Sequence, residues 1–119
     1  MNVYLAGPMS GYENYNYPAF DAAATRLREL GLTVESPHEI DSKYPGRAVY
    51  NDPQQEWRFY MSKCIPMVFQ ADAIVMLPGW STSNGACIEH QIAEERGIHI
   101  YMYDSPEFER TLSLLAAVG

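Results

Sequence analysis

The sequence predicts one α/β domain over residues 1–119, with helices on both faces of a parallel sheet of four or five strands. Short apolar runs alternate along the chain with segments whose apolar residues recur at helical spacing. Strands that alternate with helices are typical of parallel sheets, because parallel neighbours need long crossover connections. Since such crossovers are almost always right-handed, few topologies remain. We therefore expect a Rossmann-like or flavodoxin-like three-layer sandwich.

The first half of the chain is predicted to hold two strands and one helix. Residues 3–6 are apolar and read as the first strand. Pro18 opens a helix, because the first helical turn does not need the N–H that proline lacks, and Gly31 is suited to end it. Residues 32–34 form a second short strand, and residues 38–53 show no period. The apolar positions of the helix are Phe20, Ala23, Ala24, Leu27 and Leu30.

A second helix and a third strand follow. Residues 54–70 have helical spacing, with Pro66 inside the segment. A proline there removes one helical hydrogen bond and clashes with the preceding turn, so we expect the helix to kink or to split in two. Residues 73–77 form a continuous apolar run, which is typical of a strand buried on both faces.

The last part of the chain is predicted to hold two helices and a strand. Residues 84–96 have helical spacing and end at Gly97, and residues 98–103 form the fourth strand. Ser105 is a plausible N-cap for a final helix through residue 115, with a proline in the first helical position.

The composition restricts the possible partners. The chain has 47% hydrophobic and 19% charged residues, which is ordinary for a globular protein, and its net charge is −7. Binding to a nucleic-acid polymer requires clustered lysines and arginines, so we expect no such partner. A single nucleotide needs only a few local donors and stays possible. No apolar run approaches the length of a membrane span, and no signal pattern opens the chain, so we expect a cytoplasmic protein without membrane contact.

The metal-ligating side chains do not form a set. The two cysteines, Cys64 and Cys87, have no metal-like spacing, and neither do the three histidines. We therefore expect reduced thiols and neither a metal nor another cofactor. Cys87 lies near a helix start, where a thiol can be acidified. No histidine partner supports a catalytic thiol, so a small core residue is the simpler interpretation.

The segment 77–89 carries the strongest functional signal. A buried strand ends, a loop of small polar residues turns, and a helix begins. Ligands of open α/β sheets bind where strands end and helices begin, and a helix start is a ready anion site. Glu89 lies in the second helical turn beside small or apolar residues, which aims it at the covered side. We expect this carboxylate to stay ionised, as suits a nucleophile. The alternative is a surface glutamate bordering the apolar stripe.

The loop after the first strand is the second candidate. Its glycines allow the backbone to approach a ligand closely, and Ser10 adds a hydroxyl group. It matches neither a dinucleotide-binding fingerprint nor a Walker loop, so an ordinary strand-to-helix turn is the alternative. Tyrosines 12, 15 and 17 follow, and could stack on a planar base or cover the sheet edge. The residues of this candidate are Gly7, Pro8, Met9, Ser10, Gly11 and Tyr12.

Four polar or aromatic residues in the third loop are candidate ligand contacts. Ser81, Ser83 and Asn84 could each cap the helix, and those that do not are available for a phosphate or a sugar hydroxyl. Trp80 is either a stacking platform or a hydrophobic plug. Asp72, at the start of the third strand, is a candidate catalytic carboxylate or merely ends the preceding helix.

Taken together, three segments resemble the nucleoside 2-deoxyribosyltransferase superfamily, which includes 2′-deoxynucleoside 5′-monophosphate N-glycosidases. The segments are residues 3–11, residues 71–75 and residues 85–89 with Ala93 and Gly97, and the resemblance extends over residues 2 to about 103. The Pro-Gly-Trp sequence at 78–80 is similar to a small phage-associated branch.

The resemblance implies a mechanism. Glu89 matches the family nucleophile, which attacks C1′ of a 2-deoxyribosyl unit and forms a covalent glycosyl-enzyme that water or a second base resolves. The loop 7–11 matches the segment lining sugar and base, and Ser81 and Ser83 lie where a phosphate-binding branch places a serine. Many relatives carry an aspartate at the position of Cys64, which cannot act as a carboxyl acid. Asp52, Glu56 or Asp72 would have to substitute, or the activity is weak or lost.

Three functions therefore remain as hypotheses. The first is cleavage or exchange of the N-glycosidic bond of a deoxynucleoside or its monophosphate. The second is a phosphoribohydrolase of the cytokinin-activating type, which fits less well because Trp80 replaces a glycine. The third is a nucleotide-binding or sequestering module without catalysis, which Cys64 favours. The resemblance also implies a homo-oligomer, with residues 38–53 and the last helix as candidate contacts.

Overall fold

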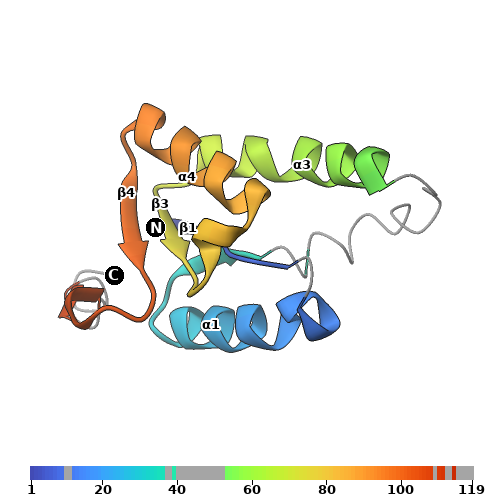
Figure 1. The fold of residues 1–119 in the computed structure, drawn as a ribbon. Helices are drawn as coiled ribbons and strands as arrows, with labels where there is room; N and C mark the ends of the chain where they lie inside the picture. The colour runs from blue at the N-terminus through green and yellow to red at the C-terminus, as the bar shows by residue number, and fades with distance from the viewer. Residues whose placement is uncertain (10–11, 37–38, 40–52, 109, 112–113, 115–119) are drawn as a thin grey trace.

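The fold is a parallel sheet with helices on both faces, as the computed structural model shows (Figure 1). The structure describes residues 1–9, 12–36, 39, 53–108, 110–111 and 114. Four parallel strands lie in the order β2-β1-β3-β4. This confirms the predicted α/β three-layer sandwich. The strands are β1 (Asn2–Ala6), β2 (Thr33–Glu35), β3 (Ala73–Met76) and β4 (His99–Met102).

The strand order reverses between β1 and β3. Strand β2 pairs with one side of β1, and β3 pairs with the other side of β1. In the pairing of β1 with β3, Tyr4 lies opposite Ile74. The loops after β1 and β3 consequently lead to helices on opposite faces of the sheet, and the word crevice is used below for the carboxyl edge where these two loops leave it. In sheets of this kind the carboxyl ends at such a reversal are the usual place for a ligand.

Two layers of helices enclose the sheet (Figure 1). Helix α1 (Tyr17–Glu29) covers one face, and α3 (Pro53–Gln70) and α4 (Asn84–Arg96) lie side by side on the other. Strand residues alternate between the two faces. Val3 and Leu5 of β1 belong to the core cluster under α1, whereas Tyr4 and Ala6 belong to the cluster under α3 and α4. The alternation of β1 therefore determines which helices Tyr4 meets.

The helix ends follow the sequence signals. Ser83 caps α4, because its Oγ accepts a hydrogen bond from the backbone N–H of Ala86 at 3.2 Å. Gly97 ends the same helix in the left-handed conformation with φ of 75°. Ser105 caps the final helical turn, because its Oγ accepts from the N–H of Phe108 at 3.1 Å. These three predictions are confirmed.

Helix α3 contains Pro66, where the sequence predicts a kink or a split. The helix is one continuous element from Pro53 to Gln70, so the alternative of a split in two is wrong. Pro66 lies on an exposed face, where water can satisfy the carbonyl group that loses its helical partner. No helix among the described residues is long and apolar enough to cross a membrane.

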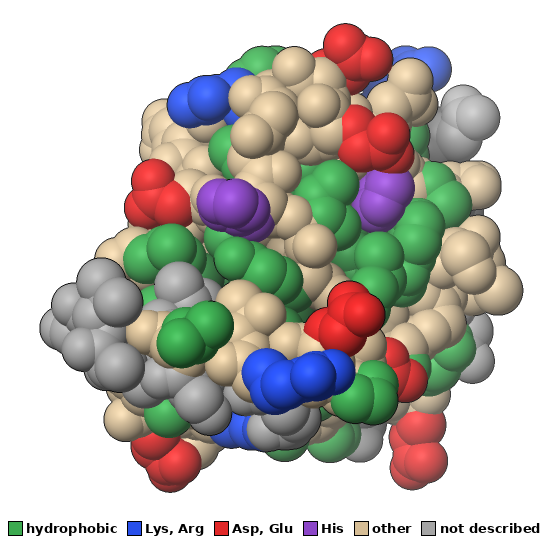
Figure 2. All heavy atoms as spheres, turned by 90° about the vertical axis from the view of Figure 1, so that its left-hand side faces the viewer, with side chains coloured by type: hydrophobic (Ala, Val, Ile, Leu, Met, Phe, Trp, Pro, Cys, Tyr) green, Lys and Arg blue, Asp and Glu red, His purple; other side chains and the backbone are tan. Residues whose placement is uncertain are grey.

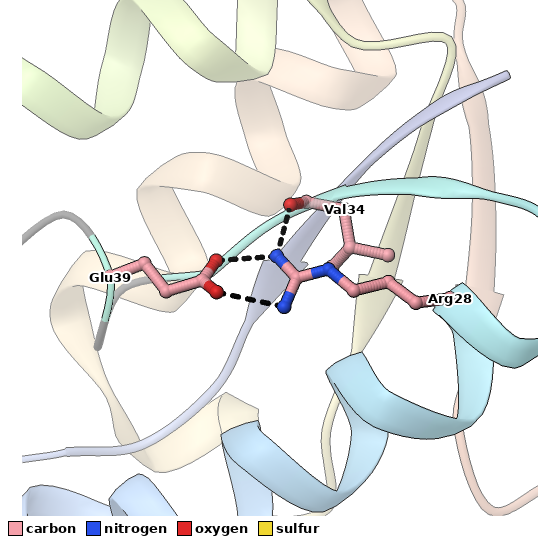
Figure 3. A network of polar contacts seen from close by, with 3 residues as sticks. All are labelled: Arg28, Val34 and Glu39. Atoms are coloured by element: carbon pink, nitrogen blue, oxygen red, sulfur yellow. Dashed lines mark hydrogen bonds and ion pairs between the residues drawn. The ribbon is translucent and has the colours of Figure 1, made fainter.

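An ion pair fastens the chain beyond β2 (Figure 3). The guanidinium of Arg28 on α1 donates to both carboxylate oxygens of Glu39, at 2.7 and 2.5 Å, and to the carbonyl oxygen of Val34 at 2.8 Å. The carboxylate raises the pKa of Arg28 above its usual value. Both side chains are about two-fifths exposed, so this pair contributes little to the stability of the domain, about 1 kcal/mol or less.

Strand β4 forms one edge of the described sheet. Hydrophobic side chains and histidines gather on this side of the molecule (Figure 2). The ring of His99 stacks on that of Tyr101, with centroids 5.9 Å apart, and Tyr101 also packs against the buried Phe108. The turn that follows β4 thus covers part of the edge strand's apolar surface.

Candidate functional site

The loops that follow β1 and β3 meet at the carboxyl edge of the sheet. The backbone N–H of Leu77 donates to the carbonyl oxygen of Ala6 at 2.8 Å, which joins the two strand ends. Gly7 lies so close to Leu77 that a Cβ at Gly7 would be 2.9 Å from the Leu77 Cβ. The close backbone approach that the sequence predicts for the loop after β1 is therefore present. The segment that approaches this loop is the loop after β3.

Gly79 and Tyr12 form a second contact between these loops. Gly79 has φ of +84°, in the left-handed region, and a Cβ there would lie 2.8 Å from the Tyr12 hydroxyl oxygen and 3.4 Å from Pro8. The glycine is thus required both by its backbone conformation and by the tyrosine that lies over it. Tyr12 itself is 45% exposed, so the ring lines the surface of the crevice and remains available to a ligand.

Tyr15 and Tyr17 lie farther along the same connection. Their ring centroids are 5.7 Å apart and the rings are tilted by 41°. Asn16, between them, donates from its side-chain amide to the carbonyl oxygen of Pro8 at 3.0 Å. This connection therefore holds the first loop in place as α1 begins.

Glu89 is buried between α4 and the sheet. Its exposed fraction is 4%, and its Oε2 accepts a hydrogen bond from the hydroxyl group of Tyr4, which is fully buried on β1. The prediction that Glu89 faces the covered side of its helix is confirmed. The sequence analysis missed Tyr4, because it lies in an apolar run and was interpreted only as core. The available signal was a phenol in an aliphatic strand, since a buried Tyr hydroxyl needs a partner.

The charge state of Glu89 differs from the prediction. Burial raises the pKa of this carboxyl group from 4.5 to about 8, and the hydrogen bond from Tyr4 lowers it only in part. The prediction that Glu89 stays ionised is therefore wrong, because burial favours the protonated form at neutral pH. The helix N-terminus acts within the first turn, whereas Glu89 lies in the second turn and among apolar side chains. Desolvation outweighs the helix dipole at this position.

Asp72 is located at the opposite end of the sheet. It precedes β3, its backbone N–H donates to the carbonyl oxygen of Asn2 at 2.8 Å, and its Oδ2 accepts from the N–H of Asn2 at 2.8 Å. These bonds join the amino ends of β1 and β3, while Leu77 and Ser83 lie beyond the carboxyl end of β3. The structure thus gives Asp72 a structural role and does not bring it together with the loops of the crevice.

The third loop is built around the short helix η3 (Trp80–Thr82). The Trp80 ring stacks on the His90 ring, with centroids 4.5 Å apart and planes at 10°, and His90 Nδ1 lies 2.8 Å from Glu94 Oε1. Trp80 also packs against the core cluster under α4. It therefore acts as a plug that fastens the loop to the helix, and one ring face is already occupied.

The remaining polar residues of this loop have different surroundings. Ser81 is exposed, and its carbonyl oxygen lies 3.4 Å from the Cys87 sulfur, which donates to it. Ser83 caps the helix, and Asn84 is exposed at its first position. Ser81 and Asn84 are consequently exposed polar residues of this loop that a ligand can reach.

Helix α3 packs beside α4 over the core cluster that contains Tyr4. Cys64 is fully buried in the cluster that also contains Tyr4. Cys64 and Cys87 form no disulfide. Met61 and Trp57 lie one and two turns before Cys64 and approach Gly85 on α4. The predicted residues Ser10, Gly11 and Asp52 and the side chain of Glu56 lie outside the described part of the chain.

No group of three or more histidine, cysteine, aspartate or glutamate side chains within the described ranges could hold a metal ion.

The chain belongs to a protein family defined by a domain of unknown function, DUF4406, whose model matches residues 1–102. The match includes the sheet, the crevice and Glu89. No curated protein matches the sequence.

A solved structure with the same fold is that of a 2-deoxyribosyltransferase from the psychrotolerant bacterium Bacillus psychrosaccharolyticus. The two chains superpose with a TM-score of 0.65 over 84% of this chain and 69% of the other, at 24% sequence identity. The fold that the sequence resemblance implied is therefore confirmed.

The burial of Glu89 predicts how stability depends on pH. Because the folded state raises the pKa of Glu89 from 4.5 to about 8, it retains a proton that the unfolded chain releases. The protonated Glu89 therefore contributes fully to the free energy of unfolding below pH 4.5. This contribution is lost as the pH rises to about 8, and the total loss is at most about 5 kcal/mol. Glu89→Gln removes the titration but keeps an acceptor for Tyr4. In urea titrations from pH 5 to 8.5, the wild type should lose stability relative to this variant.

Equal slopes for the two proteins over this pH range would contradict the burial of Glu89. Glu95→Gln, an exposed position on the same helix, is the matched control and should follow the wild-type slope.

Proposed function

We propose that this protein cleaves or exchanges the N-glycosidic bond of a 2′-deoxynucleoside or its 5′-monophosphate, with Glu89 as nucleophile. The observation that carries the proposal is the buried Glu89–Tyr4 pair beneath the carboxyl edge of the sheet, at the strand-order reversal. The fold shared with a 2-deoxyribosyltransferase supports the same class of chemistry. The reaction would use a small-molecule nucleoside or nucleotide and no cofactor.

The reaction proceeds by two displacements at one carbon. An ionised Glu89 oxygen attacks C1′ of the sugar, the bond from C1′ to the base nitrogen breaks, and the electron pair leaves with the base, which takes up a proton. A water molecule, losing a proton, or the nitrogen of a second base then attacks C1′ and releases Glu89 as a carboxylate. The positive charge that develops on the sugar in each step is stabilised by the nearby carboxylate.

Tyr4 serves this chemistry as a positioning residue. Its hydroxyl group donates to one oxygen of Glu89 and leaves the other oxygen for C1′. Because the pair is buried, an ionised Glu89 has little water around it and reacts as a desolvated nucleophile. The same burial makes the ionised form rare at neutral pH, so deprotonation of Glu89 becomes part of the barrier.

The residues around the crevice supply the binding surface of the proposal. The first loop (Gly7, Pro8, Met9, Ser10, Gly11) with Tyr12 would contact sugar and base. Ser81, Ser83 and Asn84 lie at the start of α4, where a 5′-phosphate would meet helix N–H groups. Trp80 shapes this loop by its stack on His90. As part of the proposal the protein acts in the cytoplasm as a homo-oligomer.

A second function is favoured by one feature of the site. Cys64 stands in the buried cluster beside Tyr4, where a carboxyl acid would be expected in a hydrolase of this type, and a thiol is a poor proton donor to a leaving base. A protein that binds the nucleotide without cleaving it is consistent with this cluster. Binding measured by calorimetry, with no base released on chromatography, would select this second function.

Substitution of Glu89 tests the assignment directly. Glu89→Gln keeps the size of the side chain and the hydrogen bond from Tyr4 but removes the nucleophile. Base release from a panel of deoxynucleosides and their monophosphates, followed by chromatography, should fall by at least about a thousandfold. The control is Glu95→Gln, which should retain wild-type turnover. Turnover by Glu89→Gln at the wild-type rate would refute the role of Glu89.

The pH dependence of the reaction gives a second test. Since burial raises the pKa of Glu89 to about 8, the reactive carboxylate accumulates only as the pH approaches that value. The value of kcat/KM reports the ionisation of groups in the unliganded enzyme. It should rise about tenfold from pH 6 to pH 7 and level off above pH 8. A profile that is flat from pH 6 to 9 would show that Glu89 does not need to lose a proton in this reaction.

A further inference from the structure

The burial of Glu89 poses a question of access. A nucleophile has to touch its substrate, yet only 4% of this residue is exposed. On one side the fully buried Tyr4 covers it from the sheet, and Ala86 and Ala93 on its own helix are also buried. These neighbours belong to the packed core, so a path to Glu89 has to pass another part of its surroundings.

Gly85 lies in this other part of the surroundings of Glu89. It precedes Glu89 by four residues on α4, so both lie on the same face of the helix. Side chains of a helix point back toward its N-terminus. The Glu89 side chain therefore lies over the turn that contains Gly85. Because glycine has no side chain, the strip of helix surface between the start of α4 and Glu89 has room for side chains of a neighbouring helix.

Two side chains of α3 fill this strip. A Cβ at Gly85 would lie 3.3 Å from the Met61 sulfur and 3.7 Å from the Trp57 indole nitrogen. Met61 is 4% exposed, whereas Trp57 is 42% exposed, so the two side chains extend from the interior to the surface. Met61 therefore lies against the turn of α4 that precedes Glu89, and Trp57 lies beside it at the surface.

The chemistry of Met61 suits a movable cover. A methionine side chain is unbranched, has three rotatable bonds and adapts its shape at small cost. Tyr4 and the two alanines have no comparable freedom, because their positions are set by the sheet and by the helix backbone. Displacement of one flexible side chain would open the strip without moving either helix.

We propose that Met61 and Gly85 form the entrance to Glu89 and determine the size of the molecule that reaches it. Met61 is the movable cover, Gly85 provides the gap into which the entering group fits, and Trp57 forms the outer rim. The inference that this group is the sugar of a nucleoside rests on the proposed function. The entrance itself depends only on the packing of α3 against α4.

The proposal predicts opposite effects for two substitutions. Met61→Ala removes the cover and makes Glu89 reachable. Gly85→Ala fills the gap with a methyl group that presses on the Met61 sulfur, and so narrows the entrance. This second variant is expected to fold, because alanine is a better helix former than glycine and the flexible end of the Met61 side chain can shift by the few tenths of an ångström that the methyl group requires. Met61→Leu restores most of the lost volume and should return access toward the wild-type level.

Labelling of carboxyl groups measures access without any substrate. A water-soluble carbodiimide with glycine ethyl ester couples to protonated carboxyl groups, and peptide mass spectrometry reports the rate at each glutamate. Glu95, exposed on the same helix, is the internal reference. We expect the labelling rate of Glu89, relative to Glu95, to rise at least tenfold in Met61→Ala. In Gly85→Ala we expect it to fall at least threefold.

General loosening of the core is controlled by Met67→Ala. Met67 is half-buried on α3 and packs against the same cluster, but it is not among the side chains nearest to Gly85. This variant should leave the relative rate at Glu89 within twofold of wild type. A Met61→Ala rate within twofold of wild type, or an equal rise in Met67→Ala, would overturn the proposal. If Met61→Ala does not fold, an unchanged rate in Gly85→Ala overturns it.

The outcomes separate this proposal from the proposed function. Labelling that follows the prediction, in a protein that releases no base from any deoxynucleotide, would retain the entrance and reject the glycosidase. Base release that depends on Glu89, with labelling unaffected by Met61 and Gly85, would retain the enzyme and reject this entrance.

Discussion

The hydrogen bond between Tyr4 and Glu89 is the constraint around which the other features of the site are arranged. It joins the central strand β1 to helix α4 inside the cluster that α3 also covers. Both side chains are buried, and this hydrogen bond satisfies a polar atom of each. The position of the helix, the protonation of the carboxyl group and the limited access to it all follow from placing this pair in the core.

The loops at the carboxyl edge are organised by contacts of a different kind. Gly7 against Leu77 and Gly79 beneath Tyr12 allow two loops from neighbouring strands to touch, and each contact uses the absence of a side chain. The stack of Trp80 on His90 fastens the second of these loops to α4. Backbone contacts and ring stacking thus hold the two loops together at the carboxyl edge, near a carboxyl group whose pKa burial raises.

Much of the fold could be predicted from the sequence, because its signals are local. Ser83, Gly97 and Ser105 act at helix ends through their own neighbours, and Glu89 was aimed inward by helical spacing alone. The site was predicted less well, because its properties arise between distant residues. Tyr4 and Glu89 are 85 positions apart in the sequence. Asp72 is a candidate catalytic carboxylate by sequence, but the strand register places it at the amino edge of the sheet. The charge of Glu89 depends on its burial by α4, β1 and the neighbouring α3, which are far apart in the sequence. No local sequence pattern indicates this burial.

The central claim is that Glu89 is a buried, neutral carboxyl group that must lose a proton before it reacts. The most direct test is a ¹³C NMR titration of the glutamate side-chain carboxyl carbons, with the Glu89 signal assigned by its disappearance in Glu89→Gln. The structure predicts a midpoint near pH 8 for this signal, well above the other glutamates. A midpoint near the ordinary value of 4.5 would contradict the account, since it would show a hydrated carboxylate already ionised at neutral pH.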